Sequence, residues 1–275
     1  MAVLSIYFLL SLHQDLDVGS IYCSHLLNIE VLEEEPKIHL LNFDSRIYNK
    51  CIKFAYKIDE KIDDEKYYKK CDEIEKLYNS KLSLLFTLFF NQSGYNTIVE
   101  QINQENQATQ SSNGYPQNLK LSSKHGFNIS EFEELFNKLI LLVDKNKLNK
   151  IEVISALLQS AFTDPTLFTS FMVIILEALF VDNEKAESTY KFKMRQSYFF
   201  NKLGKGTSDS KVINDWYGLR SSVLHGSKKY DDPKLFTKST LHETNKLIFE
   251  NVKLAIFEYI KGNLDPKKID EEMVK

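Results

Sequence analysis

Cysteine, histidine and glycine are scarce in this chain of 275 residues, which has 3 Cys, 6 His and 9 Gly. Cys23, Cys51 and Cys71 stand far apart with no CxxC spacing. Their number and spacing argue against a disulfide framework and against a zinc site. The histidines show no ligand spacing either, so we expect neither a metal nor a cofactor. Buried, reduced thiols in a cytoplasmic protein are the simplest expectation.

The chain also lacks a strong charge of one sign and a long apolar run. Its formal net charge is -3, so attraction of the whole molecule to nucleic acid is not indicated. Residues 205–240 are locally basic, with six Lys and one Arg against four Asp. The apolar residues 1–10 are shorter than the ~20 residues that cross a bilayer. They also lack the basic region and cleavage site of a signal peptide, so we expect no membrane partner.

Hydrophobic periodicity predicts a mainly α fold in four stretches. Residues 1–90 are expected to be a mostly helical region, with a short strand as an alternative at 37–43 and either a helix or a strand at 1–10. Residues 91–128 are rich in Asn, Gln and Ser, which predicts a linker or long loop. Residues 129–262 show helical patterning throughout, and residues 263–275 form a charged C-terminal tail.

Capping residues, proline and glycine predict the helix boundaries of the second half. Helices should start at Ser130 (with Glu133 as a capping box), Asp164-Pro165, residue 184, Ser208 or Asp209, and Asp232-Pro233, and should end at Gly204, Gly226 and Gly262. The helix over 167–180 is apolar on nearly every face, which is typical of a central helix. It carries one acid, Glu177. A buried acid needs a partner, and Arg195 on the next helix is the expected one; the alternative is a direct role of Glu177 in the functional site.

Arg220 and His225 stand five residues apart next to Gly226, at the end of a predicted helix. An imidazole can take up and return a proton near neutral pH, and a guanidinium fits phosphate oxygens with a two-pronged fork. A base that deprotonates a ribose 2′-hydroxyl and a cation that stabilises the phosphoryl oxygens are sufficient to cut RNA without a metal. The pair therefore has the groups that RNA cleavage needs, although an Arg and a His five residues apart are common by chance.

Geometry sets a condition on this pair. Five residues advance about 140° around an ideal helix, so the two side chains do not share a face. Either Gly226 ends the helix early, or a two-fold dimer brings two copies of the pair together. The alternative is structural: Arg220 is a surface or ion-paired residue, and His225 is a helix C-terminal residue that the helix dipole favours.

Neighbouring residues have two interpretations each. Tyr217 lies one turn before Arg220 and either stacks a base or packs beside Trp216. Lys228 and Lys229 follow the pair and either hold RNA backbone or are simply solvated.

Three segments in order carry a resemblance to a known family. Residues 217–226, with Arg220 and His225, resemble the signature of HEPN domains, in which an Arg is followed by four to six residues and a His. Residues 175–180, with Glu177, resemble the Leu-Glu-x-Leu segment of the ApeA-like branch. Residues 187–200, with Arg195, resemble the following Arg-x-Ala helix. The resemblance spans about residues 129–262.

The resemblance implies an all-helical, homodimeric bundle with metal-independent endoribonuclease activity, often in toxin, abortive-infection or other antiphage systems. It assigns catalysis to Arg220 and His225 and a supporting role to Glu177 and Arg195. It also implies an antitoxin or a defence-system partner. Residues 1–128 would be the remnant of a longer N-terminal part. Ser221 departs from the Asn, His or Asp of many active members. The alternative is a HEPN module that dimerises, or binds a nucleotide or a partner, without catalysis.

Overall fold

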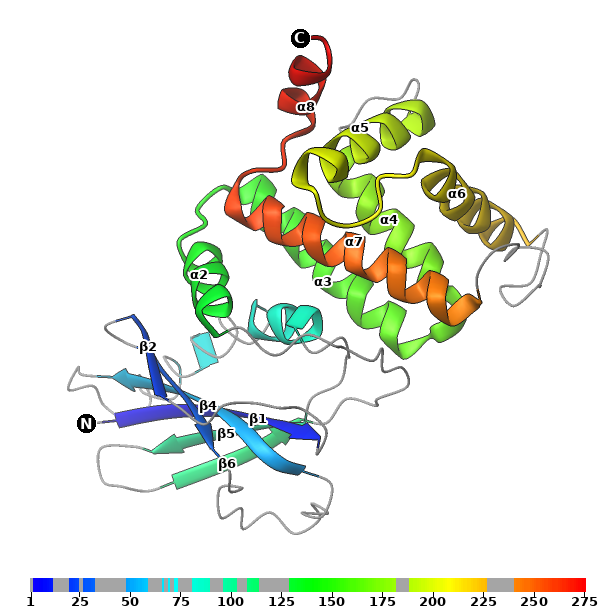
Figure 1. Ribbon diagram of the computed structural model, residues 1–275. Coiled ribbons are helices and arrows are strands. Elements are labelled where there is room, and N and C mark those ends of the chain that lie inside the picture. The colour runs from blue at the N-terminus through cyan, green and yellow to red at the C-terminus, as the bar shows by residue number, and fades with distance from the viewer. Residues whose placement is uncertain are drawn as a thin grey trace. The chain divides into compact units, whose positions relative to one another are not determined.

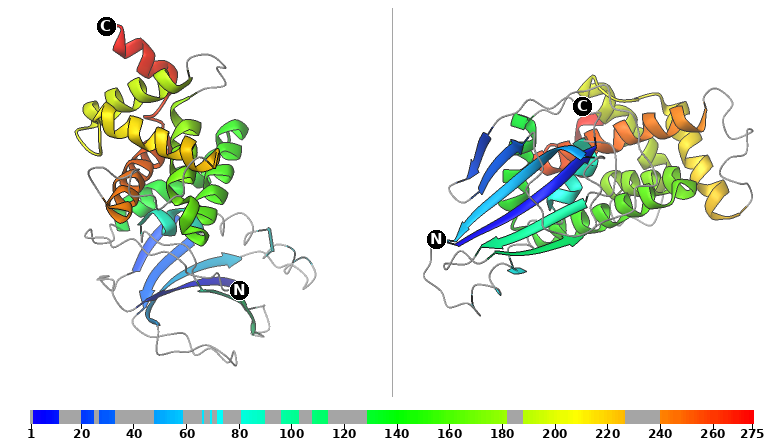
Figure 2. Two further views of the ribbon diagram at one scale, coloured as in Figure 1. Left: turned by 90° about the vertical axis from the view of Figure 1, so that its right-hand side faces the viewer. Right: turned by 90° about the horizontal axis from the view of Figure 1, so that it is seen from below.

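The protein consists of two compact units, which are described separately. The first comprises residues 1–117 and 122–140, and the second residues 118–121 and 141–275. The computed structural model (Figures 1 and 2) describes residues 2–11, 20–24, 27–32, 48–58, 66, 69, 72–73, 81–89, 96–102, 108–113, 129–181, 188–226 and 240–275. More of these residues lie in helices than in strands, so the prediction of a mainly α chain is confirmed.

A six-stranded sheet occupies the first unit. Its strands are β1 (Ala2–Ser11), β2 (Ser20–Ser24), β3 (Leu27–Leu32), β4 (Tyr48–Ile58), β5 (Asn96–Ile102) and β6 (Ala108–Asn113). Their order in the sheet is β2-β3-β4-β1-β5-β6, and every neighbouring pair is antiparallel. β1 lies inside the sheet, where Ile6 pairs with Phe54 of β4 on one side and with Val99 of β5 on the other.

The sheet corrects two predictions. The mostly helical region expected over 1–90 contains four strands, and the linker expected over 91–128 contains β5 and β6. In β4, Ile52, Phe54, Tyr56 and Ile58 alternate with other residues, which is the period of a strand. In β5 and β6 the backbone pairs with neighbouring strands, and a polar composition does not prevent this pairing. The alternative strand at 37–43 lies outside the described residues.

Among the described residues of the first unit, 66, 69 and 72–73 are helical, and two longer helical stretches follow them in the chain. One covers residues 81–89, and the other is α2 (Ile129–Ile140). Both lie over one face of the sheet (Figures 1 and 2). The Phe132 ring of α2 lies 5.4 Å from each of the Phe86 and Phe89 rings. The helical domain was predicted to begin at residue 129. In the structure α2 belongs with the sheet, and the helical unit begins after residue 140. Ser130 lies inside α2, so the capping box expected there is also wrong.

The second unit is a helical bundle. Its elements are α3 (Lys145–Thr163), η1 (Pro165–Leu167), α4 (Phe168–Phe180), α5 (Ser188–Leu203), α6 (Ser210–Leu224), α7 (Leu241–Lys261) and α8 (Pro266–Met273). α4 contacts α3, α5, α6 and α7, which confirms the central helix predicted from its apolar sequence. An aromatic cluster closes the core, with the Phe162 ring 5.2 Å from Phe168 and 5.3 Å from Phe249.

Most of the predicted helix boundaries in the second unit hold. The side chain of Asp209 caps α6, and Gly204, Gly226 and Gly262 follow helix ends with positive φ. α7 begins with a capping box of Thr240 and Glu243, which the sequence analysis missed. The starts predicted at residue 184 and at Asp232-Pro233 lie outside the described residues.

Residues 263–275 were predicted to be a charged tail, but most of them form the helix α8. α8 begins at Pro266, and the side chain of Asp265 caps it by accepting a hydrogen bond from the Lys267 amide. Proline at the first helical position after a capping Asp is a strong start signal. Among the helices that the structure describes, none has the length and apolar content to cross a membrane.

Candidate functional site

Arg220 and His225 lie at the C-terminal end of α6. The regular helix ends at Leu224, and His225 is the C-cap residue with φ -86° and ψ 3°. Its amide donates to the carbonyl of Ser221 at 3.0 Å, and the amide of Gly226, at φ +66°, donates to Val223 at 3.0 Å. Glycine adopts this left-handed conformation without strain. The helix therefore stops at the histidine, which is exposed at the bundle surface.

Arg220 is held half-buried against α4. Its Nη2 lies 3.3 Å from Oε2 of Glu177, and the two side chains are 25% and 23% exposed. Its Cζ lies 5.8 Å from the centre of the Tyr217 ring, within the range of a cation–π contact. Its Nε is buried, and no described residue accepts a hydrogen bond from it. A guanidinium has five N–H donors, so the Glu177 contact leaves donors for an anionic ligand.

Glu177 is the acid that the sequence analysis placed on the central helix. Burial raises the pKa of its carboxyl above the ordinary value, and the charge of Arg220 lowers it by a smaller amount. The carboxylate is therefore partly desolvated, and Arg220 is the cation that compensates it.

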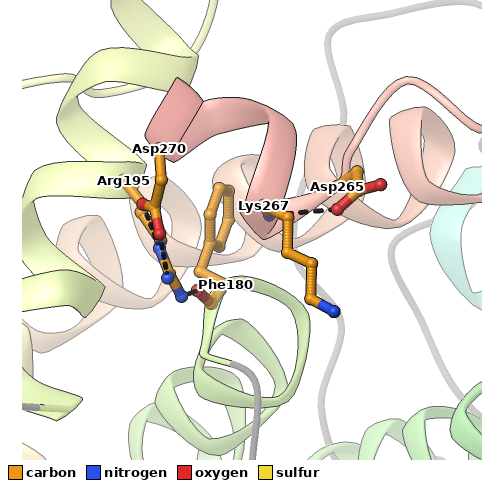
Figure 3. A network of polar contacts seen from close by, with 5 residues as sticks. All are labelled: Phe180, Arg195, Asp265, Lys267 and Asp270. Carbon is orange, nitrogen blue, oxygen red and sulfur yellow. Dashed lines mark hydrogen bonds and ion pairs between the residues drawn. The ribbon is translucent and has the colours of Figure 1, made fainter. Parts of the chain in front are cut away.

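The predicted pairing of Glu177 with Arg195 is wrong. Arg195 is 1% exposed and binds the carboxylate of Asp270 on α8, with Nε 2.7 Å from Oδ1. Its Nη1 donates to the carbonyl of Phe180 at 2.8 Å (Figure 3). Asp270 was not expected as the partner of Arg195, because residues 263–275 were predicted to be a charged tail. Arg195 therefore supports the bundle by fixing α8 and the end of α4.

The ring of Tyr217 packs against other side chains of the bundle. The ring lies 5.6 Å from Phe192 of α5, and its hydroxyl accepts a hydrogen bond from Thr189 at 3.0 Å. These contacts favour packing over base stacking. The side chain of Ser221 is half-exposed one turn before His225. Lys228 and Lys229 lie outside the described residues.

One further polar residue was not anticipated. Gln196 of α5 is 0% exposed, and within the described ranges neither its amide nitrogen nor its amide oxygen has a hydrogen-bond partner. Buried polar groups without partners are rare and costly. No sequence signal marks this position, since Gln196 stands in an ordinary helical pattern.

The described residues contain no group of three His, Cys, Asp or Glu side chains with the arrangement of a metal site. No protein-family model matches the chain, and no curated protein and no solved structure is significantly similar to it.

Proposed function

We propose that the protein is a metal-independent endoribonuclease of the HEPN type, with Arg220 and His225 as its catalytic residues. One observation supports this most: α6 carries a half-buried arginine, paired with Glu177, five residues before the exposed histidine that ends the helix. The last turns of α6 therefore carry both chemical groups that metal-free RNA cleavage needs.

In the proposed reaction, His225 removes the proton from a ribose 2′-hydroxyl. The 2′-oxygen attacks the adjacent phosphorus, and the bond from phosphorus to the 5′-oxygen breaks. Arg220 stabilises the charge on the non-bridging phosphoryl oxygens. The leaving 5′-oxygen takes up a proton, and the products carry a 2′,3′-cyclic phosphate and a 5′-hydroxyl.

While His225 acts as the base, a second group must donate the proton that the leaving 5′-oxygen takes up. A two-fold dimer that apposes the ends of α6 supplies a second histidine and a second arginine. Leu224 and Leu247 are exposed apolar side chains, 47% and 45% accessible, on α6 and α7. Burial of these two side chains between two copies would be favourable. We therefore propose that the active form is a homodimer.

The proposed biological role is cytoplasmic, as a toxin or an antiphage effector that an antitoxin or a defence-system partner restrains. Expression should then slow growth, and His225→Ala should relieve the effect. Toxicity that persists in His225→Ala would contradict a toxin that acts through this histidine.

The chemistry is tested with a synthetic RNA that contains a single 2′-deoxy nucleotide, incubated with the protein in EDTA. Cleavage should proceed at the ribonucleotides, stop on the 3′ side of the deoxy position, and leave 2′,3′-cyclic phosphate ends. Cleavage at the deoxy position, or 3′-hydroxyl ends, would contradict 2′-hydroxyl attack. Absence of cleavage by a properly dimeric protein would favour the alternative, a HEPN module that binds a nucleotide or a partner without catalysis.

A further inference from the structure

A cavity borders the C-terminal end of α7. Its volume is about 780 Å³, and residues of α3, the end of α7 and the start of α8 line it. This volume falls in the range of about 300–1,000 Å³ that is typical of small-molecule sites. All of its lining residues belong to the second unit. The cavity is therefore a feature of the bundle alone.

Lysine dominates the charge of this cavity. Four lysines line it, against two acids, Asp144 and Asp265; the lysines are Lys147, Lys150, Lys267 and Lys268. The lining therefore has a formal charge of +2. Across the described part of the chain, none of the four lysine ammonium groups makes an ion pair, and the ammonium of Lys150 lies 5.6 Å from the centre of the Tyr259 ring. The four lysine ammonium groups thus gather positive charge at the cavity, and no described acid forms an ion pair with them.

The two acids have structural tasks of their own. Oδ1 of Asp144 accepts from the amides of Asn146 and Lys147 at 2.9 and 3.2 Å. Oδ1 of Asp265 accepts from the amide of Lys267 at 3.0 Å, while the Lys267 ammonium extends away from it (Figure 3). These bonds cap the starts of α3 and α8. The positive ends of two helix dipoles therefore border the same cavity as the lysines.

We propose that this cavity binds a small anion that carries several linked phosphates, such as a nucleoside polyphosphate or an inorganic oligophosphate. Lysine is a compact cation with three donors, well suited to phosphate oxygens. Four lysines around a concave space match several linked phosphate groups better than a single phosphate group. Recognition is through phosphate charge, because the one aromatic ring in the lining, Tyr259, is 8% exposed and already faces Lys150.

This site is remote from the proposed nuclease site. The end of α6, with Arg220 and His225, lies toward the N-terminal end of α7, and the cavity borders the C-terminal end (Figures 1 and 2). A helix of the length of α7 rises about 30 Å. Binding in the cavity does not depend on RNA cleavage, so the two proposals fail or succeed separately.

The test is calorimetric titration of the full chain with sodium tripolyphosphate in EDTA. We expect saturable binding that weakens as salt rises. Lys147→Gln and Lys268→Gln should each weaken it about tenfold, because each removes a charge-assisted contact. Lys211→Gln, at an exposed lysine of α6 outside the cavity, should leave it unchanged. Circular dichroism and the thermal midpoint check that each variant is folded.

Two further titrations identify the anion. ATP should bind about as tightly as tripolyphosphate if phosphates alone are recognised, and a short RNA without terminal phosphates should not displace tripolyphosphate. Absence of saturable binding would overturn the proposal, as would equal weakening in Lys211→Gln. Displacement by the short RNA would overturn it in favour of an RNA-backbone site.

Discussion

At the scale of single residues, the two arginines of the bundle have different surroundings. Arg195 is almost fully buried and has three contacts to Asp270 and Phe180. Arg220 is one-quarter exposed and contacts Glu177 through one amino group. Only Arg220 can present donors to a ligand from outside the bundle, which is why it, and not Arg195, fits a role in phosphate chemistry.

Glu177 gives a prediction about stability and pH. Because its pKa is raised in the folded state, the folded protein holds this proton more tightly than the unfolded chain does. The contribution of Glu177 to the free energy of unfolding therefore declines as pH rises from about 4 through the raised pKa. Glu177→Gln should lack this decline in urea unfolding. Glu152→Gln, at an exposed site on α3, is the control and should retain it; identical pH profiles for all three proteins would contradict the assignment.

Gly206 gives a second prediction. At φ +76°, a Cβ there would lie 2.9 Å from Oδ1 of Asn251 and 2.9 Å from a carbon of Phe200. Asn251 holds Thr207 with two hydrogen bonds, of 2.7 and 3.0 Å. Gly206→Ala should lower the free energy of unfolding by roughly 2–3 kcal/mol. Gly204→Ala, at φ +64° in open space, should cost about 1 kcal/mol. Equal losses of the two variants in urea unfolding would contradict the claim that crowding at Gly206 adds to the loss of stability.

At the scale of elements, α8 is fixed to the bundle by charge. Asp270 accepts from Arg195, and Glu272 accepts from Lys202 at 2.7 Å. The hydrogen bond from Arg195 holds the pKa of Asp270 below its ordinary value. The stabilisation is therefore present at neutral pH and is lost as pH falls through the ordinary Asp range and below.

Asp270→Asn should accordingly destabilise the protein at neutral pH, because it leaves the buried charge of Arg195 without its carboxylate. We expect a loss of roughly 2 kcal/mol, below the usual value for a buried pair since Asp270 is partly exposed. Glu271→Gln, at an exposed site on the same helix, should change stability little. Chemical unfolding of both variants compares them, and an unchanged midpoint for Asp270→Asn would contradict this account of α8.

Sequence reasoning succeeded where local signals and burial agree. The apolar pattern of α4 identified it as central, and Asp209, Gly204, Gly226 and Gly262 marked helix boundaries. It failed where the structure depends on partners distant in sequence. β5 and β6 have polar sequences whose backbone pairing with β1 and with each other is invisible in composition. Likewise, the partner of Glu177 was set by the packing of α4 against α6, which spacing along the chain does not reveal.

At the scale of the whole molecule, the chain divides after α2. The helical unit has its own aromatic core, including Phe162, Phe168 and Phe249. A fragment of residues 141–275 should therefore fold alone and unfold in one cooperative transition. Helical circular dichroism during thermal unfolding measures this. A fragment with a gradual, non-cooperative transition would show that the bundle depends on the first unit.

The nuclease proposal, the central claim, is tested most directly by RNA cleavage in EDTA with four forms of the protein: wild type, Arg220→Ala, His225→Ala and His242→Ala. His242 is an exposed histidine at the start of α7 and serves as the matched control. Removal of a general base or of a phosphate-stabilising donor costs about 100-fold or more. We predict that wild type and His242→Ala cleave RNA while Arg220→Ala and His225→Ala are at least about 100-fold slower. Equal cleavage by all four proteins would contradict catalysis by Arg220 and His225.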